Sequence, residues 1–322
     1  MSARHTRFIH LFGLVFALFI AGLSLTSTWA ASVYQNGQKA TLVLGQPDFL
    51  SNPRKTTQSG MYYPISISID PVSKKVFVAD TYNNRVLRFA SFDSLSNGAN
   101  AEAVLGQPDF TSSSLDTKRN RMNQPQGVVV DFNGTLWVAD TGNHRVLRFD
   151  AAASKPSGAD ADGVLGQDTF TSADGREARN RMTLPASVTI DQVGTLWVAD
   201  TYNHRVLRFD AAASKPNGAD ADGVLGQADF NTKLPGVGAN KLYLPRGVAI
   251  QDDGTLWVAD SSNHRVLRFN NAIGKANGAN ADGVLGQVDF DSNTTAANEY
   301  KIFMPTGIAI DSNGSLWVSA SD

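Results

Sequence analysis

The chain has 322 residues, with 28 lysines and arginines against 30 aspartates and glutamates, a net charge of −2, and no cysteine. The absence of cysteine excludes a disulfide framework, a thiolate zinc site and a cysteine nucleophile. The mildly acidic balance lacks the basic character of nucleic-acid-binding domains, so no nucleic-acid partner is predicted.

Residues 1–30 have the parts of an export signal. Arg4 and Arg7 provide a positive start, an almost wholly apolar run follows, and small residues precede a cleavage site near Ala30–Ala31. We therefore predict a secreted or periplasmic protein with no membrane contact beyond this segment. The alternative is an uncleaved anchor, because the apolar run 8–25 is close to the shortest length that spans a bilayer.

Residues 31–62 form an N-terminal segment before the repeats. Within it, Thr41–Gln46 reads TLVLGQ, which is similar to the AVLGQ and GVLGQ sequences that occur later in the chain. This segment predicts a strand that completes a sheet whose other strands lie elsewhere in the chain.

From residue 63 to 322 the chain repeats with a period of 60 residues. The sequence TLWVADTGNHRVLRF at Thr135–Phe149 returns with small changes at Thr195–Phe209 and Thr255–Phe269. A looser copy lies at Lys75–Phe89, and a fifth begins at Ser315. A fixed period of this kind is typical of solenoids and propellers, and it decides the architecture.

Each repeat predicts four short strands. In the second repeat these are Gly127–Asp131, two strands within Thr135–Phe149 that are separated by a polar turn, and Gly163–Gly166. Apolar residues at adjacent positions predict sheets that are covered on both faces. The small residues of the first strand favour a position nearest the axis. The sequence therefore predicts an all-β fold, a β-propeller of four-stranded antiparallel blades.

One large aromatic residue recurs in the second strand of each repeat. We expect it to wedge between neighbouring blades and to bury about 150–250 Å². The residues are Phe77, Trp137, Trp197, Trp257 and Trp317.

The long pattern that contains Asn-His-Arg-Val-Leu resembles the NHL repeat. The resemblance runs from Tyr63 to the C-terminus and implies a propeller, commonly of six blades. The period of 60 residues is longer than the family's usual unit, because the connections around the fourth strand are long. Five repeats are visible, and the last is incomplete at Asp322. We therefore expect the chain to be a fragment of a longer, six-bladed protein whose two ends pair in one sheet.

Three residue series repeat once per blade, and all three predict structural roles. His144, His204 and His264 could suggest the histidine-bound zinc of the peptide-amidating lyases, which resemble NHL proteins. Equivalent positions on separate blades cannot converge on one ion, so we predict hydrogen bonding within each blade and neither metal nor cofactor.

Turn caps are expected at the repeated aspartates Asp80, Asp140, Asp200 and Asp260. The same structural explanation applies to the repeated arginines Arg85, Arg145, Arg205 and Arg265. The Asp-Ala-Asp-Gly sequences at 160–163 and 220–223 predict solvated turns, because they lack the later ligands of a calcium loop.

The positions that vary between otherwise constant repeats are the candidates for ligand binding. The residue after the proline that begins each first strand is Ile65, Gln126, Ala186, Arg246 or Thr306. In a propeller these positions, the turns that carry Tyr82 and Tyr202, and the long loops share one face around the channel mouth. The predicted ligand-binding residues are Gln126, Arg246, Thr306, Tyr82, Tyr202, Arg121 and Arg181.

Two functions are compatible with this sequence. The first is a binding scaffold for a protein, peptide or glycan, because function on a rigid scaffold usually lies in its loops. The alternative is a propeller enzyme of the lyase or lactone hydrolase type with a metal at the central channel. No catalytic residue is predicted, because the inner strands offer mainly glycine, serine, alanine and threonine.

Overall fold

The computed structural model describes residues 38–295 and 298–320. The chain divides into two units, 1–41 and 42–322. The predicted signal segment 1–30 lies outside the described residues, and residues 38–41 form no helix or strand. Within the described part of the chain, no helix is long and apolar enough to cross a membrane.

The described strands of the unit 42–322 form five antiparallel sheets, four of them with four strands and one with two. We number these sheets as blades 1 to 5 in chain order. The strands are β1 (Pro64–Ile69), β2 (Lys75–Asp80), β3 (Arg85–Ser91) and β4 (Ala103–Leu105) in blade 1; β5 (Val128–Val130), β6 (Leu136–Asp140), β7 (Arg145–Phe149) and β8 (Gly163–Leu165) in blade 2; β9 (Pro185–Ile190), β10 (Leu196–Asp200), β11 (Arg205–Phe209) and β12 (Gly223–Leu225) in blade 3; β13 (Pro245–Ile250), β14 (Leu256–Asp260), β15 (Arg265–Phe269) and β16 (Gly283–Leu285) in blade 4; and β17 (Pro305–Ile310) and β18 (Leu316–Ala320) in blade 5.

Short 3-10 helices occupy two connections of blades 1 to 4. Those between the second and third strands are η1 (Thr81–Asn83), η3 (Thr141–Asn143), η5 (Thr201–Asn203) and η7 (Ser261–Asn263). Those after the third strand are η2 (Phe92–Ser94), η4 (Ala152–Ser154), η6 (Ala212–Ser214) and η8 (Ala272–Gly274).

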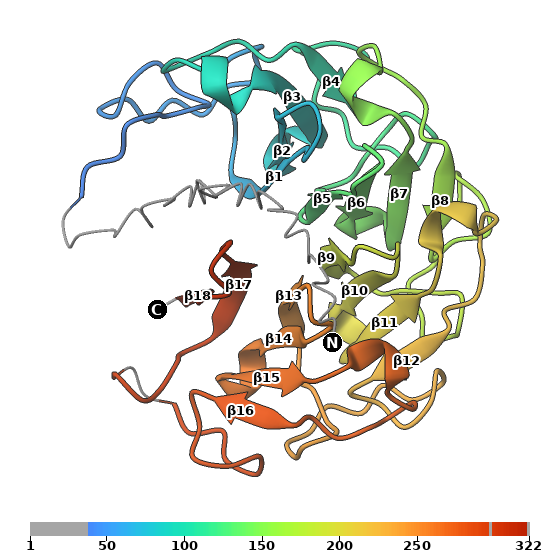
Figure 1. Cartoon of the computed structure of the whole chain (residues 1–322). Coiled ribbons are helices and arrows are strands. Elements are labelled where there is room, and N and C mark those ends of the chain that lie inside the picture. Colours follow the sequence, from blue (N-terminus) through green and yellow to red (C-terminus); the bar gives the residue numbers. More distant parts are fainter. Residues whose placement is uncertain (1–37, 296–297, 321–322) are drawn as a thin grey trace, which may run out of the picture. The chain divides into compact units, whose positions relative to one another are not determined.

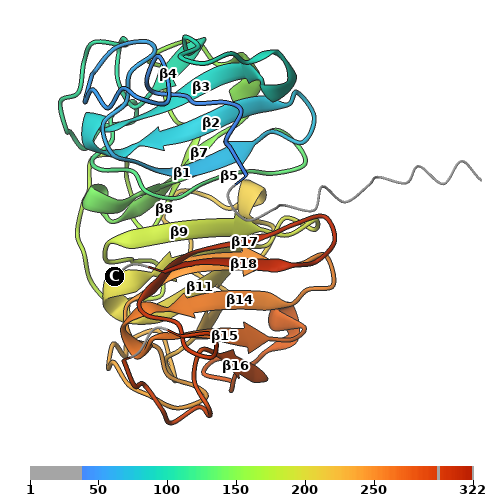
Figure 2. The same cartoon turned by 90° about the vertical axis from the view of Figure 1, so that its left-hand side faces the viewer.

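Within the unit 42–322 the blades follow one another around an axis, with the first strand of each blade innermost (Figure 1). In the side view the strands of successive blades lie roughly parallel to one another (Figure 2). Both arrangements confirm the predicted β-propeller of four-stranded antiparallel blades.

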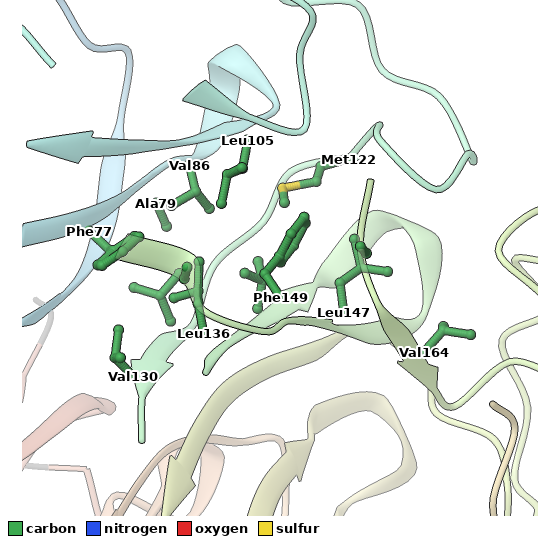
Figure 3. Packing of buried hydrophobic residues seen from close by; sticks show 14 residues of the cluster. Phe77, Ala79, Val86, Leu105, Met122, Val130, Leu136, Leu147, Phe149 and Val164 are labelled. Atoms are coloured by element: carbon green, nitrogen blue, oxygen red, sulfur yellow. The ribbon is translucent and has the colours of Figure 1, made fainter. Parts of the chain in front are cut away.

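The core of the propeller lies between neighbouring blades. Phe77 of blade 1 shares a buried cluster with Val130 and Leu136 of blade 2 (Figure 3). Trp197 of blade 3 packs in the same way in a cluster with Val248 of blade 4. The predicted aromatic wedge is therefore confirmed for blades 1 and 3. This packing requires that each sheet carry apolar residues on both faces.

Close approach of the inner strands explains their small residues. A Cβ atom on Gly127 would lie 2.7 Å from the Cα of Ser187 in the next blade. Serines at this position also have a polar role, because the hydroxyl of Ser66 accepts a hydrogen bond of 3.3 Å from the Val128 N–H of the neighbouring inner strand. Ser187 accepts one of 3.4 Å from Val248.

The predicted strand at Thr41–Gln46 is wrong, because this segment forms no strand in the structure. Its backbone still bonds as a fourth strand does: the Val43 carbonyl accepts from the Gly98 N–H at 3.0 Å, and the Val43 N–H donates to the Asn97 side chain at 3.0 Å. Val164 of β8 makes the same pair of bonds to the corresponding loop of blade 3. No third strand lies beside Thr41–Gln46 among the described residues, and a lone extended segment is not a strand.

Candidate functional site

A buried network fixes the turn between the second and third strands of each complete blade. In blade 3, Asp200 and Arg205 lie opposite each other in the sheet, and both side chains are fully buried. One carboxylate oxygen accepts bonds from Arg205 Nε at 2.7 Å and from Asn203 Nδ2 at 2.9 Å. The other oxygen accepts the Thr183 N–H at 2.6 Å. The same network recurs at Asp80–Arg85, Asp140–Arg145 and Asp260–Arg265.

The arginine of this network connects the long loops on either side of its blade. Arg205 donates to the carbonyls of Ala178 and Arg181 at 2.9 and 3.0 Å, before the blade, and to the Phe230 carbonyl after it. The prediction that the aspartates cap turns is wrong, because Asp200 makes no side-chain capping bond to η5. The Arg205 guanidinium, the Asn203 side chain and the Thr183 N–H of the preceding loop bond its oxygens instead.

Burial and hydrogen bonding act against each other on these carboxyls. Burial raises the pKa of Asp260 to about 6, although the Arg265 guanidinium and three donated bonds lower it. A pKa of about 6 leaves the group ionised at pH 7. Every partner of the carboxyl is a donor, and both of its oxygens accept hydrogen bonds, which favours the ionised form.

The histidines connect neighbouring blades. His144 Nδ1 accepts the Leu184 N–H at 3.0 Å, and His204 Nδ1 accepts the Leu244 N–H at 3.2 Å. Each histidine belongs to one blade, and the N–H that it accepts directly precedes the first strand of the next blade. The prediction that the histidines bond within a single blade is therefore wrong. In blade 1 the side-chain oxygen of Asn84 takes this position and accepts the Gln124 N–H at 2.8 Å. Asparagine and histidine alike adopt a left-handed backbone conformation here.

We expect His204→Ala to lower the free energy of unfolding by about 1–3 kcal/mol, because the Leu244 N–H loses its acceptor. His204→Asn is the matched variant, since Asn84 fills the equivalent position, and it should stay within about 1 kcal/mol of the wild type. Chemical denaturation at pH 7.5 measures both. Equal losses of unfolding free energy in the two variants would show that this hydrogen bond is not the cause.

The same bond predicts a pH dependence. Burial, followed by the charge of Lys233, lowers the pKa of His204 below its ordinary 6.5. The unfolded chain therefore binds the proton more readily, so this histidine's contribution to stability is complete above about pH 6.5 and falls as the pH drops. The wild type should lose more stability between pH 7.5 and 5 than His204→Asn does.

The variable residues at the start of the first strands come together at one end of the inner strands. They line a single cavity of about 560 Å³, which we call the channel mouth. Blade by blade, they are Ile65, Gln126, Ala186, Arg246 and Thr306. The structure thus brings together Gln126, Arg246 and Thr306 of the predicted set, one from each of blades 2, 4 and 5. Whether they bind a ligand stays a prediction.

Arg246 is the only charged side chain among the described residues that line the mouth. It is exposed, and no ion pair joins it to the described carboxylates. Apolar Ile65, Ile67 and Trp317 form another part of the wall, and Thr306 Oγ1 lies 3.1 Å from Ser319 Oγ. The mouth therefore combines one positive charge, hydroxyls and an apolar surface.

The other predicted site residues do not line the mouth. Tyr82 and Tyr202 are exposed in η1 and η5, and Tyr82 stacks on Tyr63 with ring centroids 4.8 Å apart. Arg181 is only 5% exposed, and both ends of its guanidinium bond the carboxylate of Asp168, so it is not available as a surface contact. Arg121 is half-buried and donates to the Asn120 carbonyl at 3.0 Å.

Several residues that line the mouth were not predicted as site residues, among them Trp317 and Ser319. The signal for Ser319 was a departure from the repeat: blade 5 reads LWVSA where blades 2 to 4 read LWVAD. Serine therefore replaces an alanine at this position, and its hydroxyl accepts the Gly307 N–H at 2.9 Å.

Comparison with known proteins identifies the repeat in three of these blades. The family model of the NHL repeat matches residues 122–149, 182–209 and 242–269. Each match starts in the loop before a blade and ends with its third strand. These three segments are NHL repeats, as the Asn-His-Arg-Val-Leu pattern predicted.

Curated relatives of this NHL-repeat protein include both enzymes and other proteins. It is 29% identical over 147 residues to a probable peptidyl-alpha-hydroxyglycine alpha-amidating lyase of Caenorhabditis elegans. This match covers 45% of the present chain and 36% of the lyase. It is 26% identical over 155 residues to human NHL repeat-containing protein 2, covering 46% and 20%. The chain thus spans about a third or less of the length of these relatives.

The solved structures support the fold. A nidogen/laminin complex matches with a TM-score of 0.50 and 16% identity, over 80% of this chain and 72% of that one. At this identity the likeness shows the propeller fold alone.

Proposed function

We propose that this NHL-repeat protein is an exported binding scaffold whose channel mouth takes a carboxylate-bearing group of a protein, peptide or glycan. One observation carries the proposal. The positions that vary between repeats converge on a cavity of about 560 Å³ in which Arg246 is the only charged lining residue of the described chain. This volume lies within the range of small-ligand sites.

The chemistry of Arg246 favours an anionic ligand. A guanidinium binds a carboxylate through two parallel hydrogen bonds, and this pairing is stronger than a neutral hydrogen bond. Because no described carboxylate lines the mouth, an incoming anion meets no competing partner among the described residues. Gln126 and Thr306 add an amide and a hydroxyl, while Ile65 and Trp317 offer apolar surface beside the charge.

A panel of paired ligands tests this proposal. It contains tripeptides with a free or an amidated C-terminus, and uronic-acid oligosaccharides with their neutral counterparts. We expect binding to carboxylate forms, and Arg246→Ala should weaken it at least tenfold, or about 1.4 kcal/mol. The matched control is Arg176→Ala, which removes an exposed arginine from a loop without touching the mouth.

Unchanged affinity in Arg246→Ala, or equal losses in the two variants, would contradict a site at the mouth. If the amidated and neutral forms bind as tightly as the carboxylate forms, the preference for carboxylates is contradicted.

The second candidate is a propeller enzyme, a lyase or lactone hydrolase with a metal at the channel. The similarity to the amidating lyase favours it. The described residues that line the mouth do not fit a metal site, because they include no histidine, cysteine, aspartate or glutamate. Across the described residues no group of three such side chains is placed to hold an ion. Metal analysis of the purified protein separates the candidates, since the enzyme requires a stoichiometric ion that chelation removes.

Export is the part of the proposal supported by the sequence of residues 1–30, with its basic start, apolar run and small residues before Ala31. N-terminal sequencing of the exported protein should begin at or near Ala31. A start at Met1 or Ser2 would favour an uncleaved anchor.

A further inference from the structure

The segment Leu42–Gln46 has a strand edge that is unpaired in the described chain. It reads LVLGQ and matches Gly163–Gln167, which begins with strand β8 of blade 2. It keeps the outward bonds of a fourth strand. Leu165 of β8 also pairs inward with β7, whereas the backbone groups of the equivalent Leu44 have no hydrogen-bond partner among the described residues. We call this unpaired side the open edge.

A glutamine at the end of the open edge lacks the partners of its equivalents. In blade 2, Gln167 is fully buried, and its Nε2 donates to the carbonyls of His144 and Asp174 at 3.0 Å each. The same pair of bonds recurs in blades 1, 3 and 4. Gln46 is only half-buried, and its amide makes no bond to the described chain. One of its two missing acceptors is a carbonyl directly before a third strand.

An unpaired backbone N–H lies close to this glutamine. Tyr63 directly precedes the first strand of blade 1, and its N–H has no acceptor among the described residues. At the same place in blades 2 to 5, an asparagine or histidine of the preceding blade accepts the N–H at 2.8 to 3.2 Å. Leu44, Gln46 and Tyr63 line one cavity of about 350 Å³. The structure therefore brings three groups that need partners to one place.

Blades 1 to 4 show which residues fill this place. In each of them the asparagine or histidine is followed by Arg-Val-Leu-Arg-Phe, which forms the third strand. The valine of that strand clusters with a residue of the fourth strand and one of the next loop, as Val146 does with Leu165 and Met182. Leu44 and Met61 stand at these two positions beside the open edge, and both line the cavity.

The first arginine of that strand also has an acceptor at the open edge. In blade 2, Arg145 Nη1 donates to the carbonyl of Phe170, three residues after Gln167. Phe49 stands three residues after Gln46, and its carbonyl accepts no bond from the described residues. A strand with this sequence therefore supplies a partner for each unpaired group of the open edge.

The chain has no such strand to spare. β3, β7, β11 and β15 each lie between two neighbours in their own sheet, so a second copy could donate one only by unfolding a blade. Residues 1–37 contain no Arg-Val-Leu sequence. A strand that fits is therefore supplied from outside these 322 residues, and the addition of an extended segment to a free strand edge is a common form of peptide recognition.

We propose that the open edge docks an extended strand of a partner protein, with the sequence pattern Asn/His-Arg-Val-Leu-Arg-Phe. The histidine or asparagine of the strand accepts the Tyr63 N–H, and the carbonyl of the same residue accepts from the Gln46 amide. Its valine pairs with the Leu44 backbone and packs on Met61, and its first arginine donates to the Phe49 carbonyl. The inference does not depend on the function proposed for the channel mouth, because the two cavities share no lining residue.

A labelled peptide with the sequence of residues 201–210, TYNHRVLRFD, tests the site by fluorescence anisotropy with the 322-residue chain. It should bind with a dissociation constant below about 1 mM, and a scrambled peptide should bind at least about tenfold more weakly. Alanine in place of the peptide's histidine should weaken binding by about fivefold or more, because the Tyr63 N–H loses its acceptor. Asparagine there should stay within about twofold, since Asn84 has this role in blade 1.

Variants of the chain locate the peptide. Gln46→Ala should weaken it by about fivefold or more. The matched control is Gln192→Ala, which removes an exposed glutamine that does not line the cavity and should have no effect. Arg246→Ala should also leave the affinity unchanged, which separates this site from the channel mouth. Hydrogen exchange of the Leu44 amide should slow when the peptide is added.

The proposal is overturned if the scrambled peptide binds as tightly, or if no peptide binds at about 1 mM. Equal losses of affinity in Gln46→Ala and Gln192→Ala would also overturn it. A dimer of the chain that Gln46→Ala dissociates would place a second copy at the open edge and exclude the partner strand.

Discussion

Arg205→Met is expected to lower the free energy of unfolding by about 3–5 kcal/mol, because it leaves a fully buried carboxylate without its counter-ion. The Asp200 carboxylate lies 2.7 Å from Arg205 Nε, and both side chains are fully buried. The guanidinium also satisfies carbonyls of the loops before and after blade 3. Its loss therefore removes the charge partner and loosens two loops.

Urea denaturation followed by tryptophan fluorescence measures this loss. Arg176→Met, at an exposed position, should change stability by no more than about 0.5 kcal/mol. If Arg205→Met does not accumulate as a folded protein, Arg205→Lys keeps the charge without the planar fork and should show an intermediate loss. Losses below about 1 kcal/mol in both Arg205 variants would contradict the structural role of the network.

Trp197→Ala should lower the free energy of unfolding by about 3–5 kcal/mol, the range for large buried aromatic residues. Trp197 is 1% exposed and packs in the cluster that joins blades 3 and 4. Removing the indole would leave a cavity at the interface between the blades, which rigid neighbouring sheets fill poorly. Denaturation of the same chain gives the value.

Trp317→Ala is the matched comparison, because the two tryptophans occupy the same position in the repeat. Trp317 is 50% exposed, so less of its surface leaves water on folding. We expect a loss of about 1 kcal/mol for this variant in the 322-residue chain. Similar losses at the two positions would show that the wedge between blades is not the source of the stability.

Much of the fold was predictable because a 60-residue period repeats both the strands and their two apolar faces. The same regularity identified Gln126, Arg246 and Thr306, since a position that changes in a constant framework is not needed for packing. Their convergence on one cavity follows from propeller geometry, in which equivalent strand ends meet around an axis.

Partners contributed by irregular loops could not be predicted. Arg181 looked like a surface cation, but Asp168, 13 residues earlier, takes its guanidinium. The Asp200–Arg205 network looked like local turn chemistry, yet its partners include loop carbonyls 24 and 27 residues away. Thr41–Gln46 looked like a strand because sequence alone does not show whether a partner strand lies beside it.

The central claim, that Arg246 at the channel mouth binds the carboxylate of a ligand, is tested most directly by a double-mutant cycle. The dissociation constants of wild type and Arg246→Ala are measured for the free-acid and amidated forms of the tightest ligand in the panel. The account predicts a coupling energy of at least about 1.4 kcal/mol, so Arg246→Ala should weaken the free acid tenfold more than the amide. A coupling energy near zero, with both forms weakened equally or not at all, would contradict it.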